Sequence, residues 1–347
     1  METKKNLIIR AKAPLRLGLA GGGTDVSPYS DMYGGLVLNA TINLYAHCIL
    51  EVTATNTIEI FAKDINKREI HPSAKVLPIN GTLDLGKGVY NRIVKDFNLP
   101  ALSFKMTTYS DAPAGSGLGS SSTMVVCILK AFVEWLKLPV GDYELARLAY
   151  EIERLDLNLS GGKQDQYAAA FGGFNYMEFL KDDMVIVNPL KIKRWIVDEL
   201  EESMVLYYTG ASRQSAQIID EQKNNTKNGN ATTVESLHKI KQSAKDMKQC
   251  LLFGDINGFA SIVRQGWEDK KRLAKSISNQ MIDSVMETAY QNGALAGKVS
   301  GAGGGGFITF ICKPENKYNL IKALDKLDGD VILFQFSDGG PHGWTIY

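Results

Sequence analysis

The sequence predicts an α+β fold divided into two domains. The chain has 347 residues, of which 44% are hydrophobic, and this is enough to fill one large core or two of ordinary size. Segments rich in β-branched and aromatic residues dominate the first third of the chain, whereas helical patterns dominate residues 234–292. Because the pattern changes near residue 190, we expect a first domain over residues 1–190 and a second over residues 191–347.

The individual strands and helices are predicted from the period of the apolar residues and from the Gly, Pro and Asn residues that interrupt them. A first strand over residues 6–19 is expected to be broken by Pro14, and the polar residues 222–230 are expected to form a loop. Further strands are expected at residues 33–38, 40–53, 58–62, 67–70, 101–109, 174–178, 184–187, 204–208, 296–299, 307–312 and 331–336. Helices are expected at residues 88–97, 122–138, 142–155, 166–171, 234–252, 256–275, 279–292 and 315–327.

The most informative stretch is the glycine- and serine-rich segment of residues 111–123 (DAPAGSGLGSSST), which runs directly into an apolar helix pattern. Glycine lets a ligand approach the bare main chain, and the unpaired N–H groups of a helix's first turn attract anions. A flexible linker seldom lies between two apolar segments, so a phosphate-binding loop is the better interpretation. The residues expected to bind the phosphates of a nucleotide are Pro113, Gly115, Ser116, Gly117, Leu118, Gly119, Ser120, Ser121 and Ser122.

A second glycine-rich segment, residues 81–88 (GTLDLGKG), nearly matches the phosphate-loop pattern GxxxxGK[ST]. It ends in Gly88, which has no hydroxyl group to bind Mg²⁺, and the residues before it make a poor buried strand. We therefore expect a turn that enters a helix, with Lys87 as an alternative neighbour of a nucleotide.

Candidate catalytic carboxylates lie downstream of the phosphate loop. Phosphoryl transfer needs a cradle for the phosphates, Mg²⁺ to bridge them, and a carboxylate that orients or deprotonates the acceptor hydroxyl. Glu151 and Glu153 flank the apolar stripe of their helix, roughly 100° to either side of its centre, so helical periodicity does not choose between them. Asp165 precedes a short helix, where a capping role and a catalytic role are equally suitable.

Composition and charge exclude several classes of partner. The formal net charge is +1, so we expect no basic surface for nucleic acid or for an anionic membrane. The four cysteines and four histidines show no metal-ligand spacing. No signal-peptide pattern and no run of about 18 apolar residues is visible. We expect a cytoplasmic protein with reduced cysteines, and the oligomeric state stays open.

Three segments match, in order, the motifs of the GHMP kinases, a family that includes galactokinase, homoserine kinase and mevalonate kinase. They are APLRLGLAGGGTD at residues 13–25, PAGSGLGSSS at residues 113–122 and KVSGAGGGGF at residues 298–307. Together they span nearly the whole chain, which therefore resembles this family. The resemblance implies an N-terminal domain with a left-handed βαβ crossover, a C-terminal ferredoxin-like domain, and an active site in the cleft between them.

The resemblance also implies roles for individual residues, with ATP and Mg²⁺ as cofactors. The family's spacing implies that Asp165 is the catalytic aspartate, and it selects Glu153 from the two glutamates as a Mg²⁺ ligand. Ser121 is implied as a second metal ligand, with Ser120 as the alternative, and Arg16 as the basic residue beside the transferred phosphate. The residues expected to bind the acceptor are Gly22, Gly23, Thr24, Asp25, Gly162, Lys163, Arg213, Gly303 and Gly304.

The GGGTD turn of residues 21–25 departs from galactokinase, which carries Glu-His at the positions of Gly22 and Gly23. It is similar instead to the branch of the family that phosphorylates fucose or a manno-configured heptose 7-phosphate. The resemblance thus implies an ATP-dependent kinase for the anomeric hydroxyl of heptose 7-phosphate, a small-molecule sugar phosphate. The acceptor's own phosphate needs a cation, for which Arg213 is the first candidate and Lys163 the second, with surface positions as the alternative for both.

Three other functions remain as alternatives. The first is a kinase for fucose or another unphosphorylated sugar, and the second is a catalytically silent sugar sensor on the same fold. The presence of Ser121, Glu153 and Asp165 together argues against the sensor. The third is an ATP-dependent decarboxylase of the same superfamily, which the GGGTD turn disfavours because that turn suits a polyhydroxylated acceptor.

Overall fold

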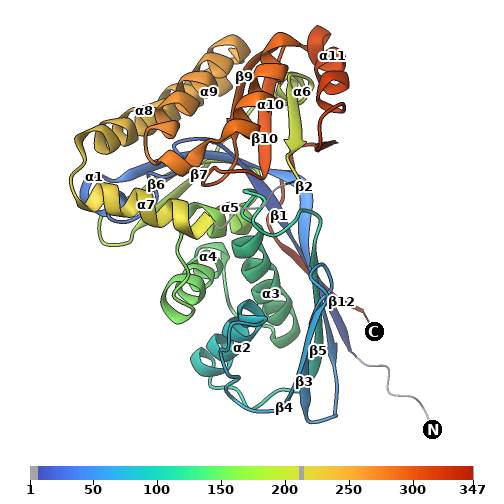
Figure 1. The fold of residues 1–347 in the computed structure, drawn as a ribbon. Helices are drawn as coiled ribbons and strands as arrows, with labels where there is room; N and C mark the ends of the chain where they lie inside the picture. The colour runs from blue at the N-terminus through green and yellow to red at the C-terminus, as the bar shows by residue number, and fades with distance from the viewer. Residues whose placement is uncertain (1–6, 211–214, 347) are drawn as a thin grey trace.

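The computed structural model describes residues 7–210 and 215–346, and it contains two β-sheets, one in each half of the molecule (Figure 1). The strands of the first sheet are β1 (Ile8–Ala20), β2 (Gly35–Val52), β3 (Thr57–Ala62), β4 (Lys67–Pro72), β5 (Phe104–Ser110), β6 (Phe174–Phe179), β7 (Val185–Pro189) and β12 (His342–Ile346). They lie in the order β12-β1-β2-β5-β3-β4, and β6 and β7 extend the sheet beside the first half of β2.

Two long antiparallel strands, β1 and β2, form the centre of this sheet and run into the other half of the molecule (Figure 1). The expectation that Pro14 breaks the first strand is wrong. β1 continues through Pro14, and its register with β2 shifts between Pro14 and Arg16. Such a β-bulge leaves room for a residue that has no N–H to donate to the ladder. The two strands expected at residues 33–38 and 40–53 form the single strand β2.

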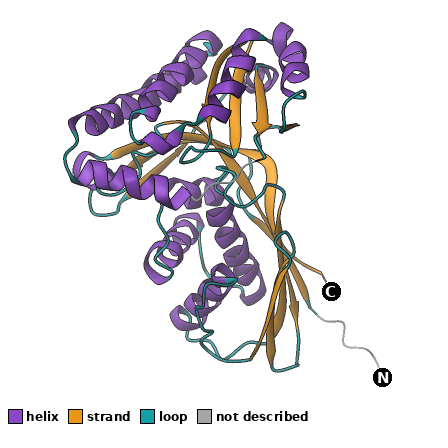
Figure 2. Cartoon of the chain, in the orientation of Figure 1, coloured by secondary structure: helices purple, strands orange, loops and turns teal. Residues whose placement is uncertain are grey.

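Helices cover one face of the first sheet, as Figure 2 shows for the lower half of the molecule. They are α2 (Asp84–Asp96), α3 (Ser120–Leu136), α4 (Asp142–Glu151), the π-helical turn η1 (Ile152–Asp156) and α5 (Gln164–Phe171). The short helix α1 (Tyr29–Tyr33) lies in the upper half of the molecule in Figure 1. As its apolar positions predict, α3 is buried on most sides, with Val125, Leu129 and Phe132 fully inside the core. Each such side chain contributes about 1.5–3 kcal/mol to folding. This packing gives the phosphate loop, which enters α3, a rigid base.

The second sheet has the strand order of a ferredoxin-like domain. Its strands are β8 (Met204–Tyr208), β9 (Ala294–Val299), β10 (Phe307–Cys312) and β11 (Asp330–Ile332). They lie in the order β11-β8-β10-β9 and pair antiparallel. Its helices are α6 (Arg194–Glu202), α7 (Ser215–Lys227), α8 (Ala231–Phe253), α9 (Ile256–Lys271), η2 (Lys275–Ile277), α10 (Gln280–Gln291) and α11 (Pro314–Leu324). The chain order is thus β-α-β-β-α-β, and the predicted α+β fold is confirmed.

Two segments differ from the expectations for the second half of the chain. Most of residues 222–230, expected to be a loop, belongs to the helix α7, in which Gln222 and Thr226 are buried. The last strand, β12, returns to the first sheet and pairs with β1, so the two described ends of the chain lie close together (Figure 1). A single boundary at residue 190 therefore does not separate the strands of the two sheets.

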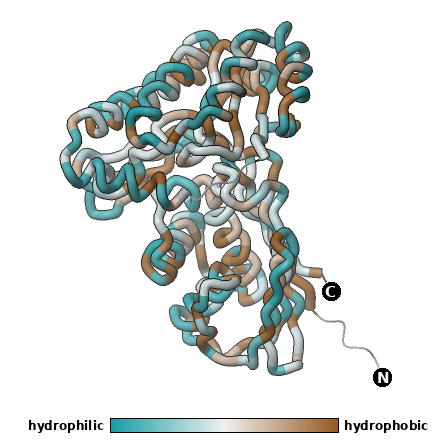
Figure 3. The backbone as a smooth tube through the Cα atoms, in the orientation of Figure 1, coloured by the Kyte–Doolittle hydropathy of each residue, from teal (hydrophilic) through white to brown (hydrophobic). Residues whose placement is uncertain are grey.

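The outer helices are polar on the surface, as the hydrophilic colouring of α7 and α8 in Figure 3 shows. Among the described residues, no helix combines the length and the apolar character that crossing a membrane requires. The cysteines are all free thiols, and Cys48, Cys127 and Cys312 are buried.

Candidate active site

A cavity of about 300 Å³ lies where the two domains meet, between the phosphate loop, the glycine turn of residues 21–25, residues 160–165 and helix α7. Figure 1 shows α7 crossing the middle of the molecule, between α8 and α9 on one side and α4 and α5 on the other. The expected site residues that line this cavity are Arg16, Gly22, Gly23, Asp25, Gly115, Gly117, Gly119, Ser120, Ser121, Ser122, Glu153, Gly162 and Asp165. The first domain supplies all of them.

The phosphate loop has the backbone conformation that its glycines predict. Gly115, Gly117 and Gly119 all have positive φ angles, of 73°, 87° and 76°, which residues with a Cβ seldom adopt. The loop then enters α3 at Ser120, so the unpaired N–H groups of the first turn of α3 lie at the cavity. This arrangement is typical of sites that bind phosphate.

The glycine-rich segment of residues 301–306 packs against the phosphate loop, backbone to backbone. A Cβ on Gly301 would lie 2.7 Å from the Cα atom of Gly117, and one on Gly306 would lie 2.3 Å from the carbonyl oxygen of Ser116. Both contacts are too close for a side chain. The second domain therefore supports the phosphate loop directly, through main-chain contact.

Gly303 and Gly304, which were expected to bind the acceptor, lie elsewhere. A Cβ on Gly303 would lie 2.9 Å from Ile277, and the N–H of Gly304 donates to the carbonyl oxygen of Ile277 at 2.8 Å. Neither residue lines the cavity. They shape the segment against η2, while the neighbouring Gly301 and Ala302 reach the cavity wall.

Arg16 and Asp165 face each other beside the phosphate loop. The Nε and Nη2 atoms of Arg16 both lie 2.7 Å from Oδ1 of Asp165, and its Nη1 donates to the carbonyl oxygen of Gly117 at 2.6 Å. Arg16 is 3% exposed, whereas the side chain of Asp165 keeps 23%. The buried guanidinium thus positions the carboxylate next to the loop and leaves part of it open to the cavity.

Glu153 rather than Glu151 faces the phosphate loop. Glu153 is 1% exposed; its Oε1 accepts a hydrogen bond from Ser121 Oγ at 3.0 Å and its Oε2 accepts one from Gln166 Nε2 at 2.5 Å. Glu151 turns away and pairs with Arg92 at 2.8 Å. Glu153 lies in η1, where the π-helical geometry departs from the 3.6 residues per turn on which the sequence argument was based.

Ser121 and Glu153 fit a Mg²⁺ ion. Both offer the oxygen ligands that Mg²⁺ prefers, and both line the cavity. Ser120, the alternative ligand, lies 3.3 Å from the hydroxyl of Ser116 instead. In the described part of the chain, no group of three or more His, Cys, Asp or Glu side chains is arranged to hold a metal ion. A Mg²⁺ ion here would therefore share its ligands between protein, phosphate and water, as is usual in kinases.

The carboxylate of Asp25 is occupied by backbone amides. Its Oδ1 accepts from the N–H of Gly23 at 3.1 Å, and its Oδ2 from the N–H groups of Lys163 at 2.9 Å and Gln164 at 3.1 Å. A Cβ on Gly162 would lie 2.0 Å from Oδ2. Burial raises the pKa of Asp25, which the amides partly oppose. Asp25 therefore joins the glycine turn to the start of α5.

Two other residues expected to bind the acceptor have their polar groups directed elsewhere. Thr24 is fully buried, and its hydroxyl lies within hydrogen-bond distance of two carbonyl oxygens, those of Gly21 at 2.8 Å and Leu36 at 2.9 Å. The ammonium group of Lys163 pairs with Asp183, and Lys163 does not line the cavity.

The two remaining candidate cations, Arg213 and Lys87, are not among the described residues that line the cavity. Arg213, the first candidate for a phosphate on the acceptor, lies outside the described residues. Lys87 is fully buried and pairs with Asp84 at 2.9 Å and Glu69 at 3.1 Å. It thus ties α2 to β4, and the near match to a phosphate loop at residues 81–88 is part of a helix.

The cavity-lining residues that sequence reasoning missed include Arg154, Gln222 and Lys270. Arg154 directly follows Glu153 in the sequence, and this position next to a predicted metal ligand could have marked it as a site residue. Gln222 lies on α7 and donates to the carbonyl oxygen of Gly23 at 3.0 Å, and Lys270 lies near the end of α9. No local pattern marks either of these two, because only the tertiary fold brings their helices to the glycine turn.

Comparison with known proteins gives matches over both halves of the chain. The GHMP kinases N terminal domain model matches residues 84–173, and the GHMP kinases C terminal model matches residues 243–328. D-glycero-alpha-D-manno-heptose 7-phosphate kinase of Campylobacter jejuni is 51% identical over 338 residues, covering 97% of this chain and 99% of the relative. The bifunctional fucokinase/GDP-fucose pyrophosphorylase of Arabidopsis thaliana is 26% identical, covering 89% of this chain and 30% of that protein.

The same similarity extends to solved structures. The crystal structure of a D-glycero-D-manno-heptose 1-phosphate kinase from Bacteroides thetaiotaomicron superposes with a TM-score of 0.85. The two sequences are 59% identical, and the match covers 98% of this chain and 99% of that one. With both family models matched and close relatives along its full length, the chain belongs to the GHMP kinases.

Proposed function

We propose that the protein is an ATP- and Mg²⁺-dependent kinase that phosphorylates the anomeric hydroxyl of D-glycero-D-manno-heptose 7-phosphate. The observation that carries this function is the Arg16–Asp165 pair, which lies against the phosphate loop in the same cavity as Ser121 and Glu153. The names of the Campylobacter and Bacteroides relatives support the choice of a heptose phosphate as acceptor.

The chain's own residues account for the chemical step. The loop amides and the first turn of α3 bind the phosphates of ATP, and Ser121 and Glu153 would hold Mg²⁺, which would supply positive charge to those phosphates. Asp165 orients the C1 hydroxyl and accepts its proton. The C1 oxygen forms a bond to the γ-phosphorus while the bond to the bridging oxygen breaks, and ADP leaves with that electron pair. Arg16 stabilises the charge that develops.

An apolar cavity of about 450 Å³ adjoins the phosphate loop and suits the base of the nucleotide. It shares Ser120 and Ser121 with the main cavity, and its walls include Ile60, Met106 and Leu157. A flat aromatic base is well accommodated by such a lining, with its phosphates directed toward the loop. ATP would then lie across the two cavities, and the acceptor would enter from the side of the glycine turn.

The acceptor's own phosphate is assigned to Arg154 within the described part of the cavity. Lys163 is engaged by Asp183, whereas the guanidinium of Arg154 makes long contacts, at 3.3–3.4 Å to backbone carbonyl oxygens and 3.8 Å to Glu153. A planar guanidinium suits a phosphate group. Arg213 stays a prediction for the same role. The cytoplasm, where ATP is supplied, stays the expected location.

A panel of acceptors tests the proposed function. Release of ADP is measured with D-glycero-D-manno-heptose 7-phosphate, heptose 1-phosphate, free mannoheptose, fucose, galactose and mevalonate. We expect kcat/KM for heptose 7-phosphate to exceed that for every other acceptor by at least about 100-fold, because the others leave the guanidinium of Arg154 without a phosphate partner or do not offer the same hydroxyl at C1. Equal turnover of fucose would favour a free-sugar kinase, and absence of ADP release with every acceptor would favour a sugar sensor.

A further inference from the structure

Among the described residues, three cationic side chains line the cavity, and one of them has no carboxylate partner there. Arg16 is paired with Asp165 at 2.7 Å, and Arg154 lies 3.8 Å from Glu153. Lys270 forms no ion pair with any carboxylate within the described residues; its ammonium group donates to a backbone carbonyl oxygen. A cation withdrawn from bulk water without a counter-ion is unfavourable unless an anion joins it.

The backbone partner of Lys270 places its ammonium group beside the phosphate loop. This partner is the carbonyl oxygen of Gly301, and Gly301 packs against Gly117 so closely that a Cβ would lie 2.7 Å from its Cα atom. Arg16 reaches Gly117 from the first domain through a hydrogen bond of 2.6 Å. Two cations, one from each domain, therefore converge on the contact between Gly117 and Gly301.

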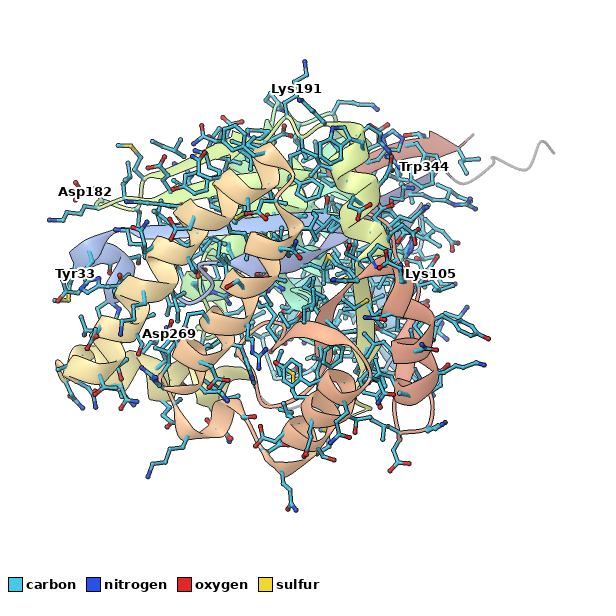
Figure 4. The ribbon with its side chains drawn as sticks, turned by 90° about the horizontal axis from the view of Figure 1, so that it is seen from above. Tyr33, Lys105, Asp182, Lys191, Asp269 and Trp344 are labelled. Carbon is cyan, nitrogen blue, oxygen red and sulfur yellow. The ribbon has the colours of Figure 1, made fainter. Side chains whose placement is uncertain are left out.

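The ordinary explanation for a lysine at the end of a helix does not account for Lys270. Lys270 and Lys271 both lie in the last turn of α9, where cations interact favourably with the helix dipole. Lys271 behaves in this ordinary way and pairs with Glu268 at 2.8 Å on the surface. Lys270 points inward instead and lines the cavity. Figure 4 labels its neighbour Asp269 and shows how α9 lies over the centre of the molecule.

Lys270 has more positive than negative groups around it. Arg16 on β1, Lys298 on β9 and Asp25 in the glycine turn are the charged groups that interact with it. Burial, together with the nearby charge of Arg16, lowers the pKa of Lys270 to about 8, although Asp25 acts in the opposite direction. Asp25 already accepts three backbone N–H groups. An arriving phosphate would supply the charge that this group of side chains lacks.

We propose that Lys270 is a further catalytic residue, which binds the transferred phosphoryl group from the side opposite Arg16; this inference rests on the proposed kinase activity. While the C1 oxygen bonds to the γ-phosphorus and ADP leaves with the electron pair of the broken bond, the proton passes to Asp165. Lys270 stays protonated throughout and donates a hydrogen bond to a non-bridging oxygen of the phosphoryl group. Its contact with Gly301, next to the phosphate loop, assigns it to this phosphate rather than to the distal phosphate of the acceptor.

The test compares Lys270→Met with Lys270→Arg and with the matched control Lys271→Met on the same helix. We expect Lys270→Met to lower kcat by about 10²–10³-fold, the usual loss when one donor to a transition-state oxygen is removed, while the Kd for ATP and the KM for the acceptor change little. Lys270→Arg should recover most of the lost rate, and Lys271→Met should match the wild type. Lys270→Gln and circular dichroism show whether any loss comes from misfolding.

A second measurement separates binding of the phosphoryl group from support of the Gly301 segment. ADP with aluminium fluoride imitates the phosphoryl group in transfer, so Lys270→Met should weaken binding of ADP with aluminium fluoride but not of ADP alone. Unchanged kcat, or equal weakening of both ligands, would overturn the inference. So would a raised KM for the acceptor with kcat intact, which would assign Lys270 to the acceptor's phosphate. If the wild-type protein prefers another acceptor, only the proposed substrate fails, and the same comparison is made with the preferred one.

Discussion

The cavity has two walls, which use their polar groups in opposite ways. The phosphate wall is the phosphate loop with Glu153 and Asp165, and the acceptor wall is the glycine turn of residues 21–25 with helix α7. On the phosphate wall, Ser121, Glu153 and Asp165 face the cavity with partners that an incoming ligand can join or replace. On the acceptor wall, Asp25 is bound by three backbone N–H groups, and Thr24 by two carbonyl oxygens. The phosphate wall is therefore built for chemistry, and the acceptor wall is built to hold the backbone of its glycine turn in place.

Two aspartates make this difference concrete. Asp165 pairs with a single arginine and keeps 23% of its side chain exposed, whereas Asp25 is 2% exposed. A sequence motif treats both as polar residues of the site. Their surroundings predict that loss of the Asp165 carboxylate lowers turnover, whereas loss of the Asp25 carboxylate lowers the stability of the fold.

The largest effect is expected for Asp165→Asn. This change keeps the size of the side chain but removes the group that accepts the proton, so we expect kcat to fall by about 10³-fold, within the usual range for a general base. The Kd for ATP, measured by calorimetry, should stay near that of the wild type, because the loop amides and α3 are unaffected. Turnover that survives in this variant would remove Asp165 from its proposed role.

The next effect tests the metal ligand on the same wall. Glu153→Gln removes the negative charge beside Ser121, so we expect the Mg²⁺ concentration for half-maximal activity to rise and kcat to fall by roughly 100-fold, or about 3 kcal/mol. The matched control is Glu151→Gln, because Glu151 pairs with Arg92 outside the cavity. An equal rise in the Mg²⁺ requirement for both variants would mean that Glu153 has no special role.

The phosphate wall could be predicted from the sequence in more detail than the acceptor wall. The loop of residues 113–122 is a contiguous stretch, and its positive φ angles and its entry into α3 follow from glycine chemistry and from the apolar pattern behind it. The strands expected at residues 58–62 and 67–70 likewise form β3 and β4, which pair antiparallel. Where the determinants of a structure lie within one short stretch, pattern and propensity are sufficient.

The acceptor wall depends on contacts between distant parts of the chain. Helix α7 has the composition of a polar loop, yet it is anchored by hydrogen bonds from Ser160 to Asp220 and from Gln222 to Gly23. The partners of Asp25 lie 138 and 139 residues away, and Lys270 reaches Gly301 from another helix. Such pairings are set by the tertiary fold, which local propensity does not contain.

The stability of the acceptor wall is tested by Asp25→Asn. An amide accepts through one atom only, so its NH₂ group would face a backbone N–H, and at least one buried donor would lose its partner. We expect the free energy of unfolding in urea to fall by about 1–3 kcal/mol, with kcat reduced far less than in Asp165→Asn. If the variant is as stable as the wild type but loses acceptor binding, Asp25 is a ligand of the sugar and the contrast between the walls fails.

The smallest effect is expected for the pH dependence of stability and concerns Lys298. Its ammonium group donates to the carbonyl oxygens of Gly18 at 2.7 Å and Leu19 at 3.0 Å, just before the glycine turn. Burial, with Lys270 and Arg16 nearby, lowers the pKa of Lys298 to about 7 from 10.5. Between about pH 7 and pH 8.5 the unfolded chain therefore binds more protons than the folded chain, and stability rises with pH.

Lys298→Gln keeps hydrogen-bond donors at this position but removes the titrating group. We expect the free energy of unfolding, measured in urea across this pH range, to rise less steeply than in the wild type, by at most about 1.4 kcal/mol per pH unit, the slope for one proton. The range stops below the usual pKa of cysteine, because the buried thiols would titrate with the opposite sign above it. Equal slopes would mean that Lys298 stays charged in the folded protein, and that the region behind the glycine turn tolerates more positive charge than its burial predicts.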